Sequence, residues 1–114
     1  MHEMSIAESV FELAQCSVPP QSHLTRVRMQ AGPMRGIVPD AMDWAWRALM
    51  ESTDTQSVEL DLDLLPWTLR CTECDRVFKA DDLFTHCACG CEKPMPVGGD
   101  ELRLISIDVD DTQE

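Results

Sequence analysis

Apolar residues recur at helical spacing in two stretches of the chain. The first stretch predicts a helix over residues 5–17, which opens on the capping box Ser5-x-x-Glu8 and ends before Pro19 and Pro20. Proline suits the first turn of a helix, so Pro39 predicts the start of a second one. The buried stripe of this second helix is expected to consist of Met42, Trp46, Leu49 and Met50.

Alternation of apolar and polar residues predicts three strands. The clearest strand covers residues 57–64, where Val, Leu, Leu and Leu alternate with Glu and Asp. Residues 23–30 and 102–109 alternate less regularly and predict two further strands. Because such alternation indicates a sheet that is covered on one face only, we expect an α+β fold with a three-stranded sheet and two helices on one face.

The periodic pattern stops in residues 70–97, where cysteines, charges and single aromatic residues replace it. We therefore expect an inserted zinc-ribbon-like module here. Residues 1–69 and 98–114 would then form one discontinuous α/β domain around the insertion. This organisation predicts that the order of the inserted module depends on a bound metal.

Five of the six cysteines lie in this insertion. A structural zinc site takes four ligands, usually from two short loops, and Cys71-x2-Cys74 has the spacing of one such loop. The second loop is irregular, and its candidate ligands are His86, Cys87, Cys89 and Cys91. Structural zinc is the expected occupant; disulfides, free thiols and a rubredoxin-like iron site are the alternatives.

Composition limits the location and partners of the chain. The 21 acidic against 9 basic residues give a net charge of −12, which is unfavourable for nucleic-acid binding. The sequence contains neither an apolar run long enough for a membrane helix nor a signal-peptide pattern. We therefore expect a cytoplasmic protein with no membrane partner, and in that reducing compartment clustered cysteines usually bind metal.

The first three residues offer a second, different metal site. Met1 contributes an α-amine, His2 an imidazole and Glu3 a carboxylate. Such nitrogen-rich termini suit nickel(II) or copper(II) in a square-planar or tetragonal arrangement. A solvated His2 is the alternative interpretation. We recognise no phosphate-binding glycine loop, serine–histidine–acid arrangement or catalytic carboxylate pair, so the sequence does not predict an enzyme.

Three other side chains carry expectations about packing. Cys16, on the first predicted helix, is expected to be a small buried residue. Trp44 and Trp46 are two positions apart, so both cannot face the core of one helix. One of the two tryptophans is therefore a candidate contact for a partner.

Four segments together resemble the HypA/HybF family of hydrogenase maturation proteins, and the resemblance covers essentially the whole chain in order. These segments are Met1-His2-Glu3-Met4-Ser5, Gly32-x3-Gly36-x2-Pro39, Cys71-x2-Cys74 and Gly98-Gly99-Asp100-Glu101-Leu102-Arg103. The combination is specific, although no single segment is.

The resemblance implies a nickel metallochaperone with a nickel-binding domain and an inserted zinc domain. It implies that Met1, His2 and Glu3 form the nickel site and that nickel is a transferred cargo. It also implies a HypB-type GTPase partner and delivery to the large subunit of a nickel-iron hydrogenase, or in some organisms to urease. Family members are often monomers or homodimers. The alternative function is a zinc-ribbon adaptor for protein interactions that carries no nickel.

The sequence departs from the family pattern at two loops. The second zinc loop is usually Cys-x2-Cys, which this chain does not have there. Counting forward from Cys74 selects Cys87 and counting backward from Gly98 selects Cys89, with Cys91 and His86 as alternatives. An acidic residue often follows the glycine-rich loop in the family. In this chain Val38, whose side chain cannot bind a metal, occupies the nearest matching position, and Asp40 lies two residues later.

Overall fold

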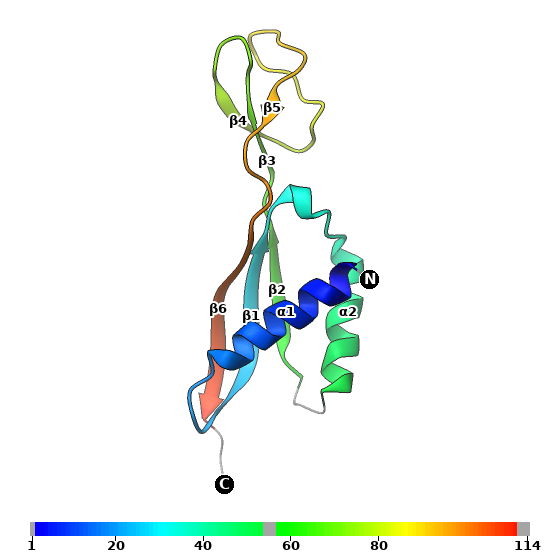
Figure 1. The fold of residues 1–114 in the computed structure, drawn as a ribbon, viewed down its shortest axis with the longest axis vertical. Helices are drawn as coiled ribbons and strands as arrows, with labels where there is room; N and C mark the ends of the chain where they lie inside the picture. Colours follow the sequence, from blue (N-terminus) through cyan, green and yellow to red (C-terminus); the bar gives the residue numbers. More distant parts are fainter. Residues whose placement is uncertain (1, 54–56, 112–114) are drawn as a thin grey trace. The chain divides into compact units, whose positions relative to one another are not determined.

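The computed structural model describes residues 2–53 and 57–111 (Figure 1). The elements in chain order are α1 (His2–Cys16), β1 (Ser22–Ala31), the 3-10 helix η1 (Pro33–Arg35), α2 (Pro39–Ser52), β2 (Glu59–Leu64), β3 (Trp67–Arg70), β4 (Val77–Ala80), β5 (Met95–Pro96) and β6 (Leu102–Asp111). They form two three-stranded sheets, with strand orders β2-β1-β6 and β4-β3-β5. The first sheet and the two α-helices confirm the predicted α+β class.

The chain divides into two compact units. The larger unit consists of the described residues within Met1–Gln30, Ile37–Asp63 and Arg103–Glu114, and the smaller unit consists of Ala31–Gly36 and Leu64–Leu102. The helices α1 and α2 and the sheet β2-β1-β6 belong to the larger unit, whereas the cysteine-rich segment belongs to the smaller one.

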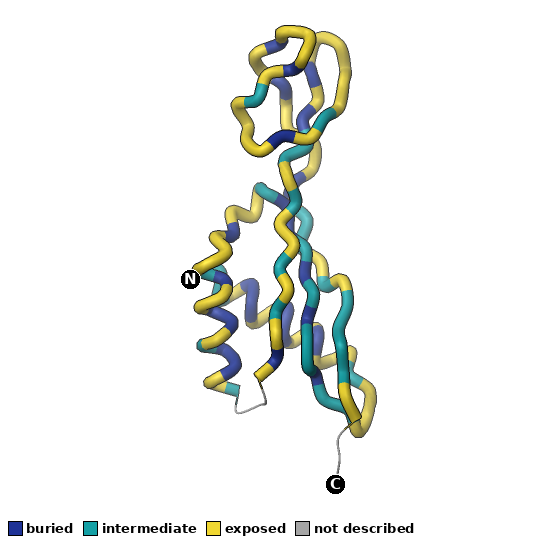
Figure 2. The backbone as a smooth tube through the Cα atoms, turned by 180° about the vertical axis from the view of Figure 1, so that it is seen from behind, coloured by how far each residue is buried: buried dark blue, intermediate teal, exposed yellow. Residues whose placement is uncertain are grey.

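The core of the larger unit lies between its helices and one face of its sheet. Buried and exposed residues alternate along both helices in Figure 2, as their apolar periodicity predicts. Phe11 of α1 meets Trp46 of α2 edge to face, with ring centroids 5.8 Å apart. The indole Nε1 of Trp46 donates a buried hydrogen bond to the Val58 carbonyl at 2.7 Å. Trp46 is thus the core tryptophan, and Trp44 is 75% exposed.

The other face of this sheet is covered by ion pairs instead of apolar side chains. Arg26 and Arg28 stand on the central strand β1 and pair with carboxylates of both neighbouring strands. Arg28 forms a bidentate pair with Asp108 of β6, both N–O distances being 2.9 Å. Arg26 pairs with Asp61 of β2 at 2.8 Å and with Glu59. Exposed pairs of this kind contribute little stability, but they keep this sheet face polar.

Two sequence-based expectations about α1 are wrong. The helix begins at His2, not at Ser5, so the sequence that resembles a capping box lies inside it. An acidic residue, Glu3, occupies the first turn, where the positive end of the helix dipole favours it. Cys16 is exposed at the end of the helix, not buried, because the buried stripe ends at Ala14.

The sheet of the smaller unit was not predicted from the sequence. Strand β3 pairs antiparallel with β4, placing Leu69 opposite Phe78, and with β5, placing Leu69 opposite Pro96. Leu69 is fully buried, and Phe78 packs against buried cysteines on the same side. Strands of four, four and two residues are too short to show a reliable period of two.

Two passes of the chain meet closely within the smaller unit. The Gly32 amide donates to the Glu101 carbonyl at 2.8 Å, and the Met34 amide donates to the Gly99 carbonyl at 2.7 Å. A Cβ atom added to Gly32 would lie 2.2 Å from the Gly99 carbonyl oxygen. The backbones can approach this closely only because Gly32 has no side chain.

Candidate metal sites

The first cysteine loop directly follows strand β3. The Cys71 amide donates to the Arg76 carbonyl at 2.8 Å, and Asp75 turns the chain in the left-handed region with φ of 63°. This turn directs the backbone N–H groups of Glu73 and Cys74 at the Cys71 sulfur, each at 3.4 Å. The loop therefore surrounds one sulfur atom with donors that favour its thiolate form.

The second cysteine loop is a tight turn closed by its own backbone. The Cys87 amide donates to the Cys91 carbonyl at 3.1 Å, and the Gly90 amide donates to the Cys87 carbonyl at 2.9 Å. Gly90 has φ of 101°, a conformation that L-residues rarely adopt. The turn leaves Cys89 exposed and Cys87 buried.

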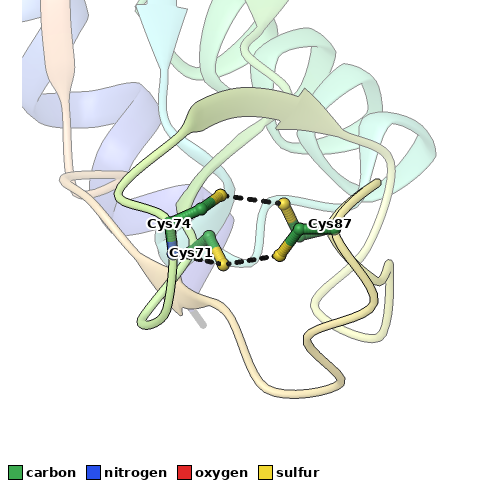
Figure 3. A group of neighbouring side chains, drawn as sticks. Cys71, Cys74 and Cys87 are labelled. Atoms are coloured by element: carbon green, nitrogen blue, oxygen red, sulfur yellow. Dashed lines mark hydrogen bonds between the residues drawn. The ribbon is translucent and has the colours of Figure 1, made fainter.

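The two loops bring four sulfur atoms together. The sulfurs of Cys71, Cys74, Cys87 and Cys89 all lie within 4.8 Å of one another. Figure 3 shows the side chains of Cys71, Cys74 and Cys87 directed toward one another. The Cys71–Cys89 sulfur distance is 3.4 Å and the Cys74–Cys87 distance is 3.7 Å. Four thiolates about 2.3 Å from a tetrahedral zinc ion would be about 3.8 Å apart, so this cluster fits zinc.

The protonation of the cluster also favours a cation. The Cys74 amide is the main cause that lowers the pKa of Cys71, and the Cys89 amide lowers the pKa of Cys87 to about 7. The Cys91 amide favours the Cys89 thiolate, but hydrogen bonds shared with Cys71 and Cys87 outweigh it and raise the pKa of Cys89 to about 12. Without a metal, then, Cys89 keeps its proton near neutral pH, because its thiol is hydrogen-bonded to the neighbouring sulfurs.

The two alternative zinc ligands lie outside this group of four sulfurs. Cys91 is buried beside Cys71 and Cys87, and its sulfur lies 3.4 Å from the Thr72 hydroxyl. His86 is exposed. Among the described residues, neither side chain joins the group that could hold a metal ion.

The described part of the amino terminus lies in the first turn of α1. Met1, the proposed amine ligand, lies outside the described residues. The His2 side chain is half exposed, and its Nδ1 lies 3.7 Å from Oε2 of Glu3. The same Glu3 oxygen accepts a hydrogen bond from the Val38 amide at 3.2 Å. That amide is the main cause that lowers the pKa of Glu3, and His2 adds a smaller effect.

The Val38 contact was missed by sequence reasoning. Val38 stands where the family often has an acidic residue, and it contributes its backbone amide instead of a side-chain ligand. Val38 is the N-cap residue of α2, so its amide is free of the intrahelical hydrogen-bond pattern and available to an acceptor. The start of α2 therefore holds the Glu3 carboxylate as an anion beside His2. Pro39 marks the helix start and hence a free amide at Val38, but no sequence signal identifies Glu3 as its acceptor.

Among the described residues, no helix is both long and apolar enough to cross a membrane.

Comparison with known proteins gives a consistent family relationship over nearly the whole chain. The family model described as "Hydrogenase/urease nickel incorporation, metallochaperone, hypA" matches residues 1–109. The hydrogenase maturation factor HypA of Geobacter metallireducens is 33% identical over 111 residues, which cover 96% of this chain and all of the relative. HypA of Geobacter sulfurreducens is 32% identical with the same coverage.

A solved structure gives the same result. The solution structure of the Ni metallochaperone HypA from Helicobacter pylori matches with a TM-score of 0.58 and 25% identity, over 100% of both chains. The resemblance stated from the four sequence segments is thus confirmed. This chain belongs to the HypA family of hydrogenase/urease nickel-incorporation metallochaperones.

Proposed function

We propose that this protein carries nickel(II) and delivers it during the maturation of a nickel-iron hydrogenase. The observation that carries the proposal is the match of residues 1–109 to a nickel-incorporation family. Delivery requires ligand exchange and no covalent chemistry, so the protein needs a cargo site from which the metal can leave. Urease is the other acceptor that the family description names.

The proposed cargo site consists of the Met1 amine, His2 and Glu3. His2 and Glu3 stand side by side in the first turn of α1, and the Val38 amide orients the carboxylate. Imidazole and amine nitrogens suit nickel(II). Binding displaces protons from these nitrogens, so acidification should release the cargo. An exposed helix start is accessible to an acceptor protein.

The proposed structural zinc site consists of Cys71, Cys74, Cys87 and Cys89. Zinc bound there would cross-link the two cysteine loops and hold β3 and β4 in place. Such cross-links contribute directly to folding in small metal-binding units. We accordingly propose that residues 1–69 and 98–114 form the nickel-binding domain, while residues 70–97 are ordered by zinc.

The proposed partners are a HypB-type GTPase and the hydrogenase large subunit. The family relationship supports this assignment, because the relatives are named hydrogenase maturation factors. The protein would act as a monomer or homodimer.

Nickel titration of tag-free, zinc-loaded protein tests the cargo site. Calorimetry with parallel elemental analysis would compare the wild type with His2→Ala and with His23→Ala, which removes a histidine of β1 as a matched control. We expect loss of tight nickel binding only in His2→Ala, at constant zinc content. Blocking the Met1 amine should have the same effect.

The outcomes of this titration distinguish a nickel carrier from a zinc-dependent interaction adaptor. Equal nickel binding by His2→Ala and wild type would place the cargo site elsewhere in the chain. If neither the wild type nor the variants bound nickel, the proposed carrier function would be wrong, and the zinc-dependent interaction adaptor would be the better explanation.

A further inference from the structure

The sheet of the smaller unit has one face that lies away from the cysteine cluster. Register places Val77, Arg70 and Met95 side by side across β4, β3 and β5. Directly opposed residues of antiparallel strands share a face. Leu69 and Phe78, one position along, belong to the opposite face, where Phe78 packs against the cysteines.

A second row of residues continues the same face. Lys79 is opposite Thr68 and donates from Nζ to its hydroxyl at 3.0 Å. On the other side of Thr68, the Val97 amide donates to the Thr68 carbonyl at 2.8 Å, which extends the β5 register by one residue. The two rows together form the outer face, defined as Arg70, Val77, Met95, Thr68, Lys79 and Val97.

The outer face is unusually apolar for a solvated sheet face. Val77 is 52%, Met95 58% and Val97 38% exposed. A sheet with one covered face normally places polar residues on the other, as the Arg26 and Arg28 face of the larger unit does. Exposed apolar side chains gathered on one surface mark interaction sites.

The charge of the outer face is opposite to that of the protein. Its two charged residues, Arg70 and Lys79, are both cationic, and neither row contains a carboxylate. Among residues 2–53 and 57–111, neither cation has a carboxylate partner within salt-bridge distance. The whole chain, in contrast, has a net charge of −12. Two unpaired cations on an acidic protein favour an acidic ligand.

We infer that the outer face is a docking surface for an acidic, partly apolar segment of a partner protein. Complementary charge would orient that segment, and Val77, Met95 and Val97 would contact its apolar side chains. Nucleic acid and anionic membranes are disfavoured, because both require larger basic clusters than two residues. The cysteine cluster behind the sheet would make the surface rigid. This inference rests on the proposed function only for the choice of candidate partners.

Two variants of the outer face test the inference through different side chains. Arg70→Glu with Lys79→Glu reverses its charge, whereas Val77→Thr with Met95→Thr removes two of its three apolar side chains and retains strand-compatible residues. Lys93→Glu is the matched control, because it reverses an exposed cation outside both rows. Zinc content and circular dichroism identify any variant that does not fold.

The binding probes are the recombinant HypB-type GTPase and hydrogenase large-subunit precursor of the same organism. Calorimetry at low and high salt should show affinity for one of them reduced by about tenfold or more in either face variant. Only the charge-reversed variant should also lose the salt dependence of binding. Lys93→Glu should bind as the wild type does.

Several outcomes would overturn the inference. Unchanged affinity of both face variants for both proteins would do so, as would failure of the wild type to bind either one. A wild-type dimer that the face variants dissociate would assign the face to a second copy of the chain instead. Face-dependent binding to DNA or anionic vesicles alone would assign it to a polyanion. The nickel titration decides the carrier function independently of all these results.

Discussion

Replacement of Gly32 by alanine tests the close approach of two chain passes in the smaller unit. The added Cβ would lie 2.2 Å from the Gly99 oxygen and 2.3 Å from Oε1 of Glu101, whereas ordinary contacts begin at 3.4 Å. The Glu101 side chain could rotate away. The Gly99 backbone cannot, because its carbonyl accepts the Met34 amide at 2.7 Å.

The expected effect follows from this rigidity. Forcing an extra methyl group into a packed site destabilises proteins by about 1–3 kcal/mol. We expect Gly32→Ala near the upper limit, at about 3 kcal/mol, because backbone must move. Gly32 itself has φ of −78°, so alanine suits its backbone conformation and the effect would be steric alone.

Gly36→Ala supplies a control in the same loop. A Cβ there has no neighbour within 4 Å, but φ is +65°, which alone disfavours alanine by about 1 kcal/mol. Urea unfolding of zinc-loaded proteins, followed by zinc release to a chromogenic chelator, reports on the smaller unit. If Gly32→Ala were no more destabilising than Gly36→Ala, the steric reasoning would be refuted.

Three further predictions concern zinc, the core and pH. Chelation of zinc should disorder the smaller unit and leave the larger one folded, and amide NMR spectra that remain dispersed throughout would contradict this. Trp46→Phe should lower the free energy of unfolding by about 1–3 kcal/mol, because the buried Val58 carbonyl loses its donor; equal urea sensitivity of Trp44→Phe would argue against that cause. Hydrogen bonding from Arg28 lowers the pKa of Asp108. The Arg28–Asp108 pair therefore contributes its full stabilisation of the fold above the ordinary aspartate pKa, and this contribution is lost as pH falls through the lowered value. Carboxyl NMR titration should show this pKa rising in Arg28→Gln.

Much of the larger unit could be predicted because its elements are long enough to show their period. The helix beginning at Pro39 and the strand over residues 57–64 each repeat an apolar position several times, and the structure has α2 and β2 there. The start of α1 was misplaced, because a sequence that resembles a capping box also fits the interior of a helix. The burial of a residue at a helix end, such as Cys16, depends on which other segments of the fold pack against it.

The candidate metal sites were predictable to different depths. Cysteine spacing identified the cluster, since four sulfur ligands must come from short loops. Cysteine spacing could not choose among Cys87, Cys89, Cys91 and His86, because these residues lie close together in one short loop. The tertiary structure groups Cys87 and Cys89 with the first loop through the turn at Gly90.

Local chemistry and local period were therefore determined by the sequence itself: the metal-binding residue types, the acidic charge, the helices and the long strands. Contacts between distant segments were decided only by the tertiary structure. The Val38 amide reaches Glu3 across 35 positions, and Arg70, Val77 and Met95 form one row from three strands. The physical reason is that backbone donors and cross-strand neighbours depend on register and packing, and neither leaves a periodic trace in the sequence.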